Sequence, residues 1–197
     1  PVRSPALFWH HDWWGWGDPM SYTDQIAQVF VMIYLQDTAK INGCLRVLPG
    51  SHRKIHGLHE NEKAHTEGVS RVENPEDPLY QSVEGEREVS VNFGDVVIGD
   101  ARLIHGAYPN QSDQERTLIT LWYHPDYSKL PEPMQTRIHE IFVRKGVDTD
   151  PDGLESMTLL QWPEKQRISV ESFFPSCPEN VIAEPWNRKP ILENINT

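Results

Sequence analysis

Three consecutive residues near the start of the chain, His10, His11 and Asp12, include a pair whose types and spacing suit a metal site. In an extended strand, side chains two residues apart point to the same face, so we expect His10 and Asp12 to project together, with His11 turned the other way. One imidazole and one carboxylate on one face are two ligands of a 2-His-1-carboxylate triad, which holds ferrous iron and leaves open positions for substrates and dioxygen. The third ligand must come from a distant segment, and His105, beside Gly106, is our candidate.

Each part of this hypothesis has a simpler alternative. A histidine on a strand is often half-buried with its hydrogen bonds satisfied, and Asp12 would then cap the start of a loop. His105 would be a core histidine bonded to a carbonyl oxygen. Taken one at a time, these residues leave both interpretations open.

Arg116 lies eleven residues after His105 and opens an apolar strand-like run. A guanidinium that points into a barrel needs an anion, because an unpaired buried charge is very costly. Its planar fork matches a carboxylate with two hydrogen bonds. Arg116 would therefore clamp the distal carboxylate of a dicarboxylate co-substrate. The alternative is an exposed charge that pairs with Asp113 or Glu115.

The composition restricts the class of protein. A length of 197 residues suits one domain with a real core. The formal net charge of −11 argues against a nucleic-acid or anionic-membrane surface and favours a small-molecule partner. The longest apolar run, Val29 to Leu35, is too short to span a bilayer, and we see no signal peptide. Cys44 lies in an apolar run, which favours a buried free thiol over a disulfide with Cys177 and fits a reducing cytoplasm.

The pattern of the chain predicts an all-β core with one late helix. Short β-rich runs alternate with Gly, Pro and Asn turns, and these runs cover residues 5–10, 27–36, 44–48, 88–93, 96–98, 103–108 and 116–124. An apolar stripe between prolines and Gly146 predicts a helix over 131–145. We expect a single domain whose core spans about residues 5–125, followed by this helix and an irregular tail that wraps the body. A double-sheet jelly roll, as in cupins, is one common solution for such strands.

Other candidate residues are weaker. The three tryptophans of the loop 13–24 are either a substrate-facing aromatic wall or core contacts of the loop. His52, His56 and His59 have spacings that zinc could use, although a solvated loop is favoured. The chain has neither a Gly-x-Ser-x-Gly elbow nor the glycine pattern of a nucleotide-binding loop, so serine hydrolysis and nucleotide binding lack support.

The candidate residues occur in a characteristic order along the chain. His10-x-Asp12 is followed by Asn-Gly-Cys-Leu-Arg-Val-Leu-Pro-Gly-Ser-His over residues 42–52, then by Phe-Gly-Asp over 93–95, His105 and Arg116. This arrangement resembles the phytanoyl-CoA dioxygenase family of Fe(II)/2-oxoglutarate-dependent oxygenases, from about Phe8 to Tyr123. The resemblance implies a double-stranded β-helix in which His10, Asp12 and His105 bind Fe(2+). It also implies that Arg116 holds the 5-carboxylate of 2-oxoglutarate.

The resemblance further implies an activity. A relative with these residues hydroxylates a C–H bond of a small molecule with dioxygen, and it releases succinate and CO2. Related halogenases carry a small residue at the carboxylate position, so the presence of Asp12 favours oxygen insertion. Two other classes remain, a cupin-like metalloenzyme that does not use 2-oxoglutarate and a non-catalytic jelly-roll binding module.

The chain departs from the family pattern at two places. Members of the family usually carry a helical region before His-x-Asp that packs on the major sheet, whereas only nine residues precede His10 here. We expect that this region lies outside the chain or that the sheet is supported differently. Met32 stands where relatives often carry a polar or aromatic neighbour of 2-oxoglutarate.

Overall fold

The computed structural model describes residues 3–60, 76–142 and 180–195. Its contacts divide the chain into two units, one formed by Pro1–Pro125 with Asn187–Thr197 and the other by Asp126–Trp186. The strands of the first unit are β1 (Leu7–His10), β2 (Val29–Tyr34), β3 (Leu45–Val47), β4 (Arg87–Val89), β5 (Val96–Asp100), β6 (His105–Ala107) and β7 (Leu118–Tyr123). This unit also contains the short 3-10 helices η1 (Pro19–Tyr22), η2 (Gly57–Glu60) and η8 (Leu192–Asn194).

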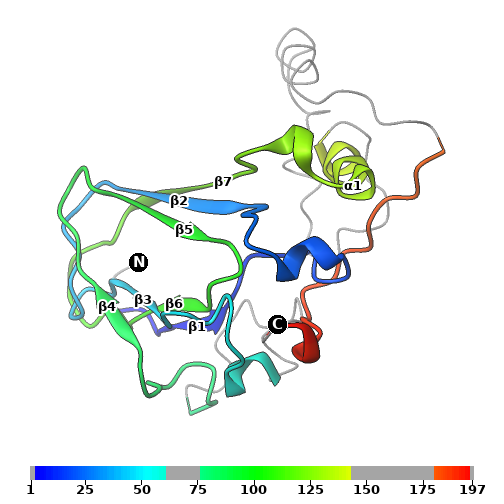
Figure 1. The fold of residues 1–197 in the computed structure, drawn as a ribbon. Helices are drawn as coiled ribbons and strands as arrows, with labels where there is room; N and C mark the ends of the chain where they lie inside the picture. The colour runs from blue at the N-terminus through cyan, green and yellow to red at the C-terminus, as the bar shows by residue number, and fades with distance from the viewer. Residues whose placement is uncertain (1–2, 61–75, 143–179, 196–197) are drawn as a thin grey trace, which may run out of the picture. The chain divides into compact units, whose positions relative to one another are not determined.

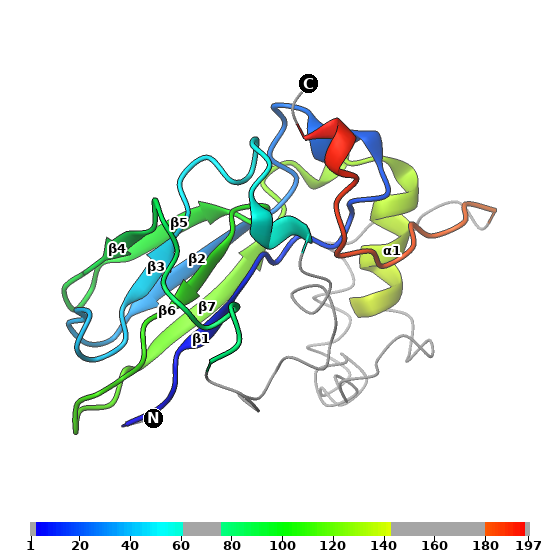
Figure 2. The same cartoon turned by 90° about the horizontal axis from the view of Figure 1, so that it is seen from below.

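The strands of the first unit form two antiparallel sheets. One sheet has the order β1-β6-β3-β4, and the other has the order β5-β2-β7. Figure 1 shows the two sheets as facing layers, and Figure 2 shows that their strands overlap and run in roughly the same direction. The predicted mostly antiparallel β core, followed by one α-helix, is therefore confirmed.

The space between the two sheets is filled by alternate side chains of β2. Phe30, Met32 and Tyr34 are buried in one core cluster with Leu45 of β3, whereas the residues between them are only partly buried. This period-two alternation of burial is not visible in the sequence, where Val29 to Leu35 is a continuous apolar run. Burial of each such side chain contributes about 1.5–3 kcal/mol, so this layer accounts for much of the cohesion between the sheets.

The strand predicted over 88–93 is shorter in the structure. β4 ends at Val89, and beyond it Val91 makes only an isolated bridge to Thr38. Phe93 is 70% exposed and lies outside β4, so the prediction of a strand that continues to Phe93 was wrong. The reason is a turn in which the amide of Asp95 donates to the carbonyl of Asn92, which lifts Phe93 out of the strand.

The outer face of the β5-β2-β7 sheet is apolar and open to solvent. Its exposed residues include Val96, Ile98, Ile119, Leu121 and Tyr123, with Ile98 67% exposed. Monomeric proteins rarely leave such a contiguous apolar face uncovered. Among the described residues of the first unit, these side chains remain exposed.

The second unit contains the helix α1 (Glu132–Phe142) and the 3-10 helix η5 (Tyr127–Lys129). Met134 and Ile138 are fully buried, as the predicted apolar stripe requires, and residues 143–145 of the predicted helix lie outside the described residues. A later segment of the same unit lies along the helix, since the amide of Glu184 donates to the carbonyl of Pro133 at 2.9 Å.

Two further predictions concern the tail and the cysteines. Most of the predicted tail, with Cys177, lies outside the described residues, but its end returns to the first unit. There Asn187 pairs with Gly15 through an isolated bridge, and its amide donates to the carbonyl of Trp14 at 2.8 Å. Cys44 is a buried free thiol, as predicted. Within the described ranges, no helix has the length and apolar character needed to cross a membrane.

Candidate metal centre

The pairing of β1 with β6 brings the two predicted histidines together. His10 stands opposite His105 in the register, and a bulge or irregularity lies between Leu7 and His10. Bulges commonly re-aim side chains next to active sites. The two imidazole ring centroids are 4.3 Å apart, and Asp12 reaches both rings from just beyond the end of β1.

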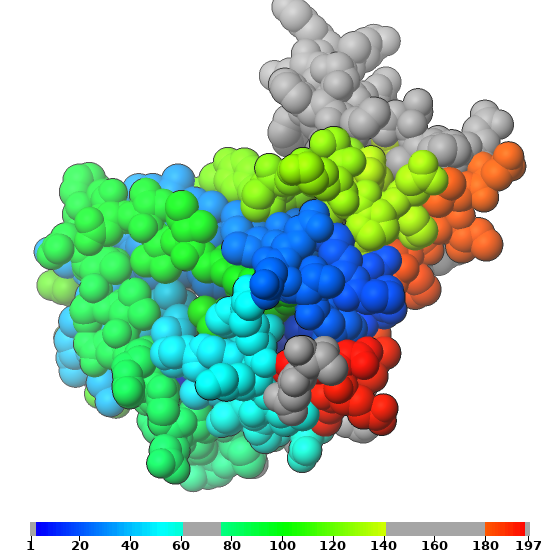
Figure 3. All heavy atoms as spheres, viewed as in Figure 1, coloured from blue at the N-terminus to red at the C-terminus, as the bar shows by residue number. Residues whose placement is uncertain are grey.

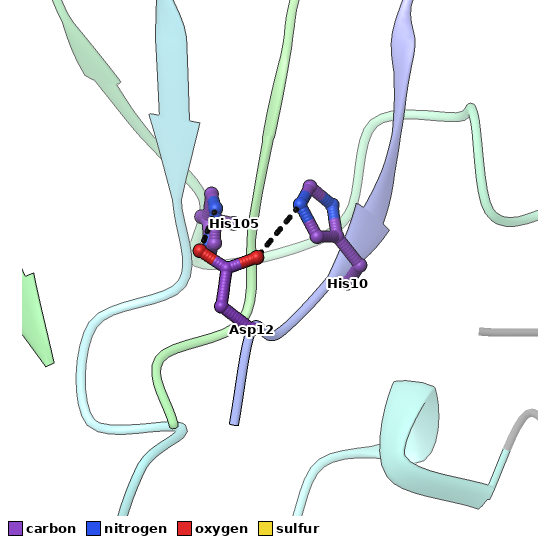
Figure 4. Close-up of side chains that lie close together, drawn as sticks. All are labelled: His10, Asp12 and His105. Atoms are coloured by element: carbon purple, nitrogen blue, oxygen red, sulfur yellow. Dashed lines mark ion pairs between the residues drawn. The ribbon is translucent and has the colours of Figure 1, made fainter. Parts of the chain in front are cut away.

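The three side chains converge on one point (Figure 4). One ligand atom from each of His10, Asp12 and His105 lies within 4.8 Å of the others. Asp12 Oδ1 is 3.5 Å from His10 Nε2, and Asp12 Oδ2 is 3.7 Å from His105 Nε2. Two donors that each lie about 2.1 Å from one ion stand about 3 Å apart, so a small inward movement would complete a coordination site.

The tautomers of the histidines also suit a metal. His10 Nδ1 lies 2.9 Å from the carbonyl oxygen of Phe8, and His105 Nδ1 lies 2.9 Å from that of Leu103. Because a carbonyl oxygen can only accept a hydrogen bond, Nδ1 carries the proton in both rings. Each Nε2 therefore keeps its lone pair and points toward Asp12. A backbone carbonyl that fixes the ring in this way is the usual support of a metal-binding histidine.

The protonation states of His10 and Asp12 are those of metal ligands. Burial, followed by the neighbouring His105, lowers the pKa of His10 to about 4. Burial acts to raise the pKa of Asp12, but the electrostatic influence of His105 and His10 and a hydrogen bond from Trp122 outweigh it, so this pKa lies below its usual value. At neutral pH the imidazole of His10 is therefore neutral and the carboxylate of Asp12 is ionised, as metal binding requires.

The lowered pKa of His10 predicts how the metal-free protein responds to acid. Between pH 6.5 and about 4, His10 takes up a proton in the unfolded chain but not in the folded chain, so stability falls as the pH falls. We expect the free energy of unfolding of the wild type to decrease relative to that of His10→Gln by up to about 1.4 kcal/mol per pH unit in this range. Urea unfolding of both proteins at pH 7, 6 and 5 measures this difference. A difference that does not change with pH would contradict the prediction.

The second sheet supports His105 through an aromatic contact. The ring of Phe30 in β2 lies 4.6 Å from the His105 ring, with 33° between the ring planes. Gly99 stands opposite Phe30 in the neighbouring β5, and a Cβ at Gly99 would lie 2.0 Å from Phe30 Cζ. Only glycine therefore leaves room for the Phe30 ring in its present position.

Substitution of Gly99 should disturb the metal centre from a distance. We expect Gly99→Ala to displace the Phe30 ring, to destabilise the fold by about 1–3 kcal/mol and to weaken metal binding. Gly57→Ala is the matched control, because a Cβ at Gly57 meets nothing within 4 Å. Urea unfolding and Mn(II) titration of both variants provide the comparison. Equal behaviour of the two alanine variants would show that the Phe30 contact does not hold His105.

The 42–52 motif and the segment before β6 hold the ligands from the backbone. Ser51 Oγ accepts a hydrogen bond from the amide of Ile104 at 2.8 Å, and the amide of Leu48 donates to the carbonyl of Ile104 at 3.0 Å. Ile104 immediately precedes His105, so these bonds set the start of β6. On the other side of the site, the carbonyl of Ala101 accepts from the amide of Asp12 at 2.9 Å.

Arg116 lies just before β7 and outside the triad. Burial lowers its pKa, whereas Tyr34 and Cys44, both fully buried, act in the opposite direction. The alternative pairing with Asp113 is not observed, because Asp113 binds Arg3 with a nitrogen–oxygen distance of 2.7 Å. Within the described part of the chain, Arg116 makes no ion pair.

Two residues near the triad were not anticipated from the sequence. Trp122 Nε1 donates to Asp12 Oδ2 at 2.8 Å, and Arg188 donates to the carbonyl of His11 at 2.6 Å. Trp122 lies six residues after Arg116 in the run predicted over 116–124, and this even spacing would place the two side chains on the same face of a strand. No pattern in the sequence pointed to Arg188. It reaches the site because Asn187, the residue before it, forms a bridge with Gly15.

The tryptophan loop proves to be a core element. Trp13, Trp14 and Trp16 are at most 3% exposed, and Trp13 Nε1 donates to Ser21 Oγ at 2.8 Å. Of the two interpretations of these residues, the structure supports core contacts.

The histidines of the 52–59 segment are not assembled into a metal site. Among the described residues, the only group of three metal-binding side chains is the His10, Asp12 and His105 triad. His56 Nδ1 instead accepts from the amide of Leu58 at 3.1 Å, and His59 Nδ1 accepts from the amide of His56 at 3.0 Å.

A cavity of about 560 Å³ lies between the tryptophan loop, the 52–54 segment and Ile195. Figure 3 shows the corresponding blue, cyan and red surfaces next to one another. None of the three triad residues lines this cavity. The metal centre is therefore defined by the convergence of its ligands rather than by this cavity.

Comparisons with known proteins agree with this geometry. The model of the phytanoyl-CoA dioxygenase family matches residues 3–118, which is more than half of the chain, so the chain belongs to the phytanoyl-CoA dioxygenase family. A probable alpha-ketoglutarate-dependent hypophosphite dioxygenase from Stutzerimonas stutzeri is 31% identical over 127 residues, which cover 62% of this chain and 41% of that protein. Phytanoyl-CoA dioxygenase 1 from Oryza sativa subsp. japonica is 32% identical over 100 residues, which cover 51% of this chain and 34% of that protein.

A solved structure shows a similar partial match. AviO1 from Streptomyces viridochromogenes is 28% identical with a TM-score of 0.43, and the match covers 63% of this chain and 45% of that chain. The matched region spans less than half the length of all three proteins.

Proposed function

We propose that this chain forms the metal centre of an Fe(II)/2-oxoglutarate-dependent dioxygenase that hydroxylates a C–H bond of a small molecule. The observation that carries this proposal is the convergence of His10 Nε2, His105 Nε2 and the Asp12 carboxylate, with both Nδ1 atoms bonded to backbone carbonyls. Two imidazoles and one carboxylate are the ligand set of non-haem ferrous oxygenases. The two facing sheets further support a double-stranded β-helix of the jelly-roll type.

The residues of the chain have distinct parts in this reaction. His10, Asp12 and His105 would hold the iron on one side and leave its other positions open. With 2-oxoglutarate and dioxygen, ferrous iron supplies an oxidation that yields succinate, CO2 and a hydroxylated product. The protein would hold the metal, orient the C–H bond of the substrate and exclude water from the site. A fixed metal and an oriented C–H bond remove most of the entropic barrier to the reaction.

Arg116 would bind the distal carboxylate of 2-oxoglutarate. Its guanidinium lies beside the buried Tyr34 and has no ion pair among the described residues, so a co-substrate carboxylate would supply the missing counter-charge. Similarity to an alpha-ketoglutarate-dependent relative supports this co-substrate. The net charge of −11 supports a small-molecule substrate over nucleic acid, and the free thiol of Cys44 supports a cytoplasmic setting.

The proposal is tested by adding Fe(II) and then 2-oxoglutarate to the metal-free protein in the absence of oxygen. We expect a visible charge-transfer band that appears only when both are present. Addition of oxygen should then convert 2-oxoglutarate into succinate, slowly and without added substrate.

The other outcomes distinguish the alternatives. Stoichiometric iron binding without the band would indicate a cupin-like metalloenzyme that does not use 2-oxoglutarate. No iron binding at all would indicate a non-catalytic binding module.

A further inference from the structure

The two carboxylate oxygens of Asp12 have different surroundings. Oδ2 accepts a hydrogen bond from the indole Nε1 of Trp122 at 2.8 Å. Oδ1 lies 3.5 Å from His10 Nε2, a nitrogen whose lone pair is free because its proton is on Nδ1. Oδ2 also lies 3.7 Å from His105 Nε2, so both oxygens face a metal-ligand nitrogen, and among the described residues only Oδ2 is also held by a donor of the protein.

Trp122 reaches Asp12 from the opposite sheet. It lies in β7, next to Phe30 in the register of β2, whereas Asp12 follows β1 of the other sheet. The Asp12 side chain is only 12% exposed, and the Trp122 residue is 51% exposed. The hydrogen bond thus joins the two sheets at the metal centre and fixes the rotation of the carboxylate.

We propose that Trp122 is a positioning residue that holds the Asp12 carboxylate in the orientation in which it binds a metal. Rotation of the carboxylate away from the two imidazoles would lose its 2.8 Å bond to the indole. This inference rests on the proposed function for the identity of the metal, but the positioning applies to any divalent ion in this site.

Trp122→Phe tests the proposal, because it removes the N–H donor and keeps an aromatic ring. We expect Mn(II) and Co(II) affinity to fall about 10–100-fold, the range typical for loss of a group that orients a metal ligand. The visible spectrum of bound Co(II) should also change, because the coordination of the carboxylate changes. Tyr123→Phe is the matched control, since it alters the next residue of the same strand on the exposed outer face.

A double-mutant cycle separates positioning from a general structural effect. If Trp122 acts through Asp12, Trp122→Phe should have no further effect on metal affinity in an Asp12→Ala background. An equal loss in both backgrounds would overturn the proposal, as would unchanged affinity and an unchanged Co(II) spectrum in Trp122→Phe.

A measurement on the wild type avoids dependence on the folding of the variant. In the nuclear magnetic resonance spectrum, the indole N–H of Trp122 should exchange slowly with solvent, and this protection should be lost in Asp12→Ala. Rapid exchange in the wild type would overturn the hydrogen bond itself. A wild type that binds no divalent metal would refute the proposed function, whereas a wild type that binds metal as tightly as Trp122→Phe would refute only this inference.

Discussion

Asp12→Ala is expected to reduce the affinity for Fe(II) or Mn(II) by more than about 100-fold and to abolish the visible band with 2-oxoglutarate. Removal of groups that merely orient a ligand costs 10–100-fold, so removal of a ligand itself should cost at least as much. The variant also removes the negative charge of the carboxylate, which is the only charge among the three ligands that offsets the charge of the metal ion. Equilibrium dialysis with Mn(II) and anaerobic titration with Fe(II) measure the two effects.

The fold should survive this substitution. Asp12 accepts its side-chain bond from a half-exposed Trp122, and its backbone amide bond to Ala101 does not depend on the side chain. Asp113→Ala is a suitable control, because Asp113 is an exposed aspartate of the same unit that pairs with Arg3. Metal binding that persists in Asp12→Ala at wild-type strength would show that the triad is not the metal site.

Arg116→Met is expected to weaken 2-oxoglutarate binding by about 30-fold or more without a matching loss of metal affinity. Loss of one partner of a buried, hydrogen-bonded charge pair costs about 2–5 kcal/mol. The 2-oxoglutarate affinity of Arg116→Lys should lie between those of the wild type and Arg116→Met, because an ammonium group keeps the charge but lacks the planar fork. Titration of the charge-transfer band with 2-oxoglutarate gives the affinities.

Stability provides the discriminating control for Arg116. In the described part of the chain its guanidinium is partly buried without an ion pair, so a methionine should leave the metal-free fold as stable as before or stabilise it. If Arg116 instead had a structural partner, Arg116→Met would destabilise the fold by a few kcal/mol. A destabilised variant with unchanged 2-oxoglutarate affinity would therefore refute the proposed clamp.

The exposed apolar face of the β5-β2-β7 sheet affects the conditions that these experiments need. Side chains such as Ile98 and Tyr123 are more than half exposed on one apolar surface. Such a surface promotes self-association at high protein concentration. Metal titrations are therefore best carried out at low protein concentration with the oligomeric state monitored.

The sequence alone determined the local features of the protein. The β-rich run over 27–36 predicted the strand β2, and the apolar stripe over 131–145 predicted a helix, in which Met134 and Ile138 are buried. The His-x-Asp spacing predicted that His10 and Asp12 project together, and the two side chains do meet, although Asp12 lies beyond the last residue of β1. These features depend on neighbours within a few residues, which is the range over which periodicity carries information.

Only the tertiary structure decided how the site is assembled. The register of β1 against β6, with its bulge, sets His10 opposite His105, and the indole of Trp122 reaches Asp12 across 110 residues of sequence. The space for Phe30 over Gly99 likewise depends on strand pairing. Such contacts join segments that are distant in the sequence, and the local pattern of hydrophobic and polar residues does not encode which positions will meet.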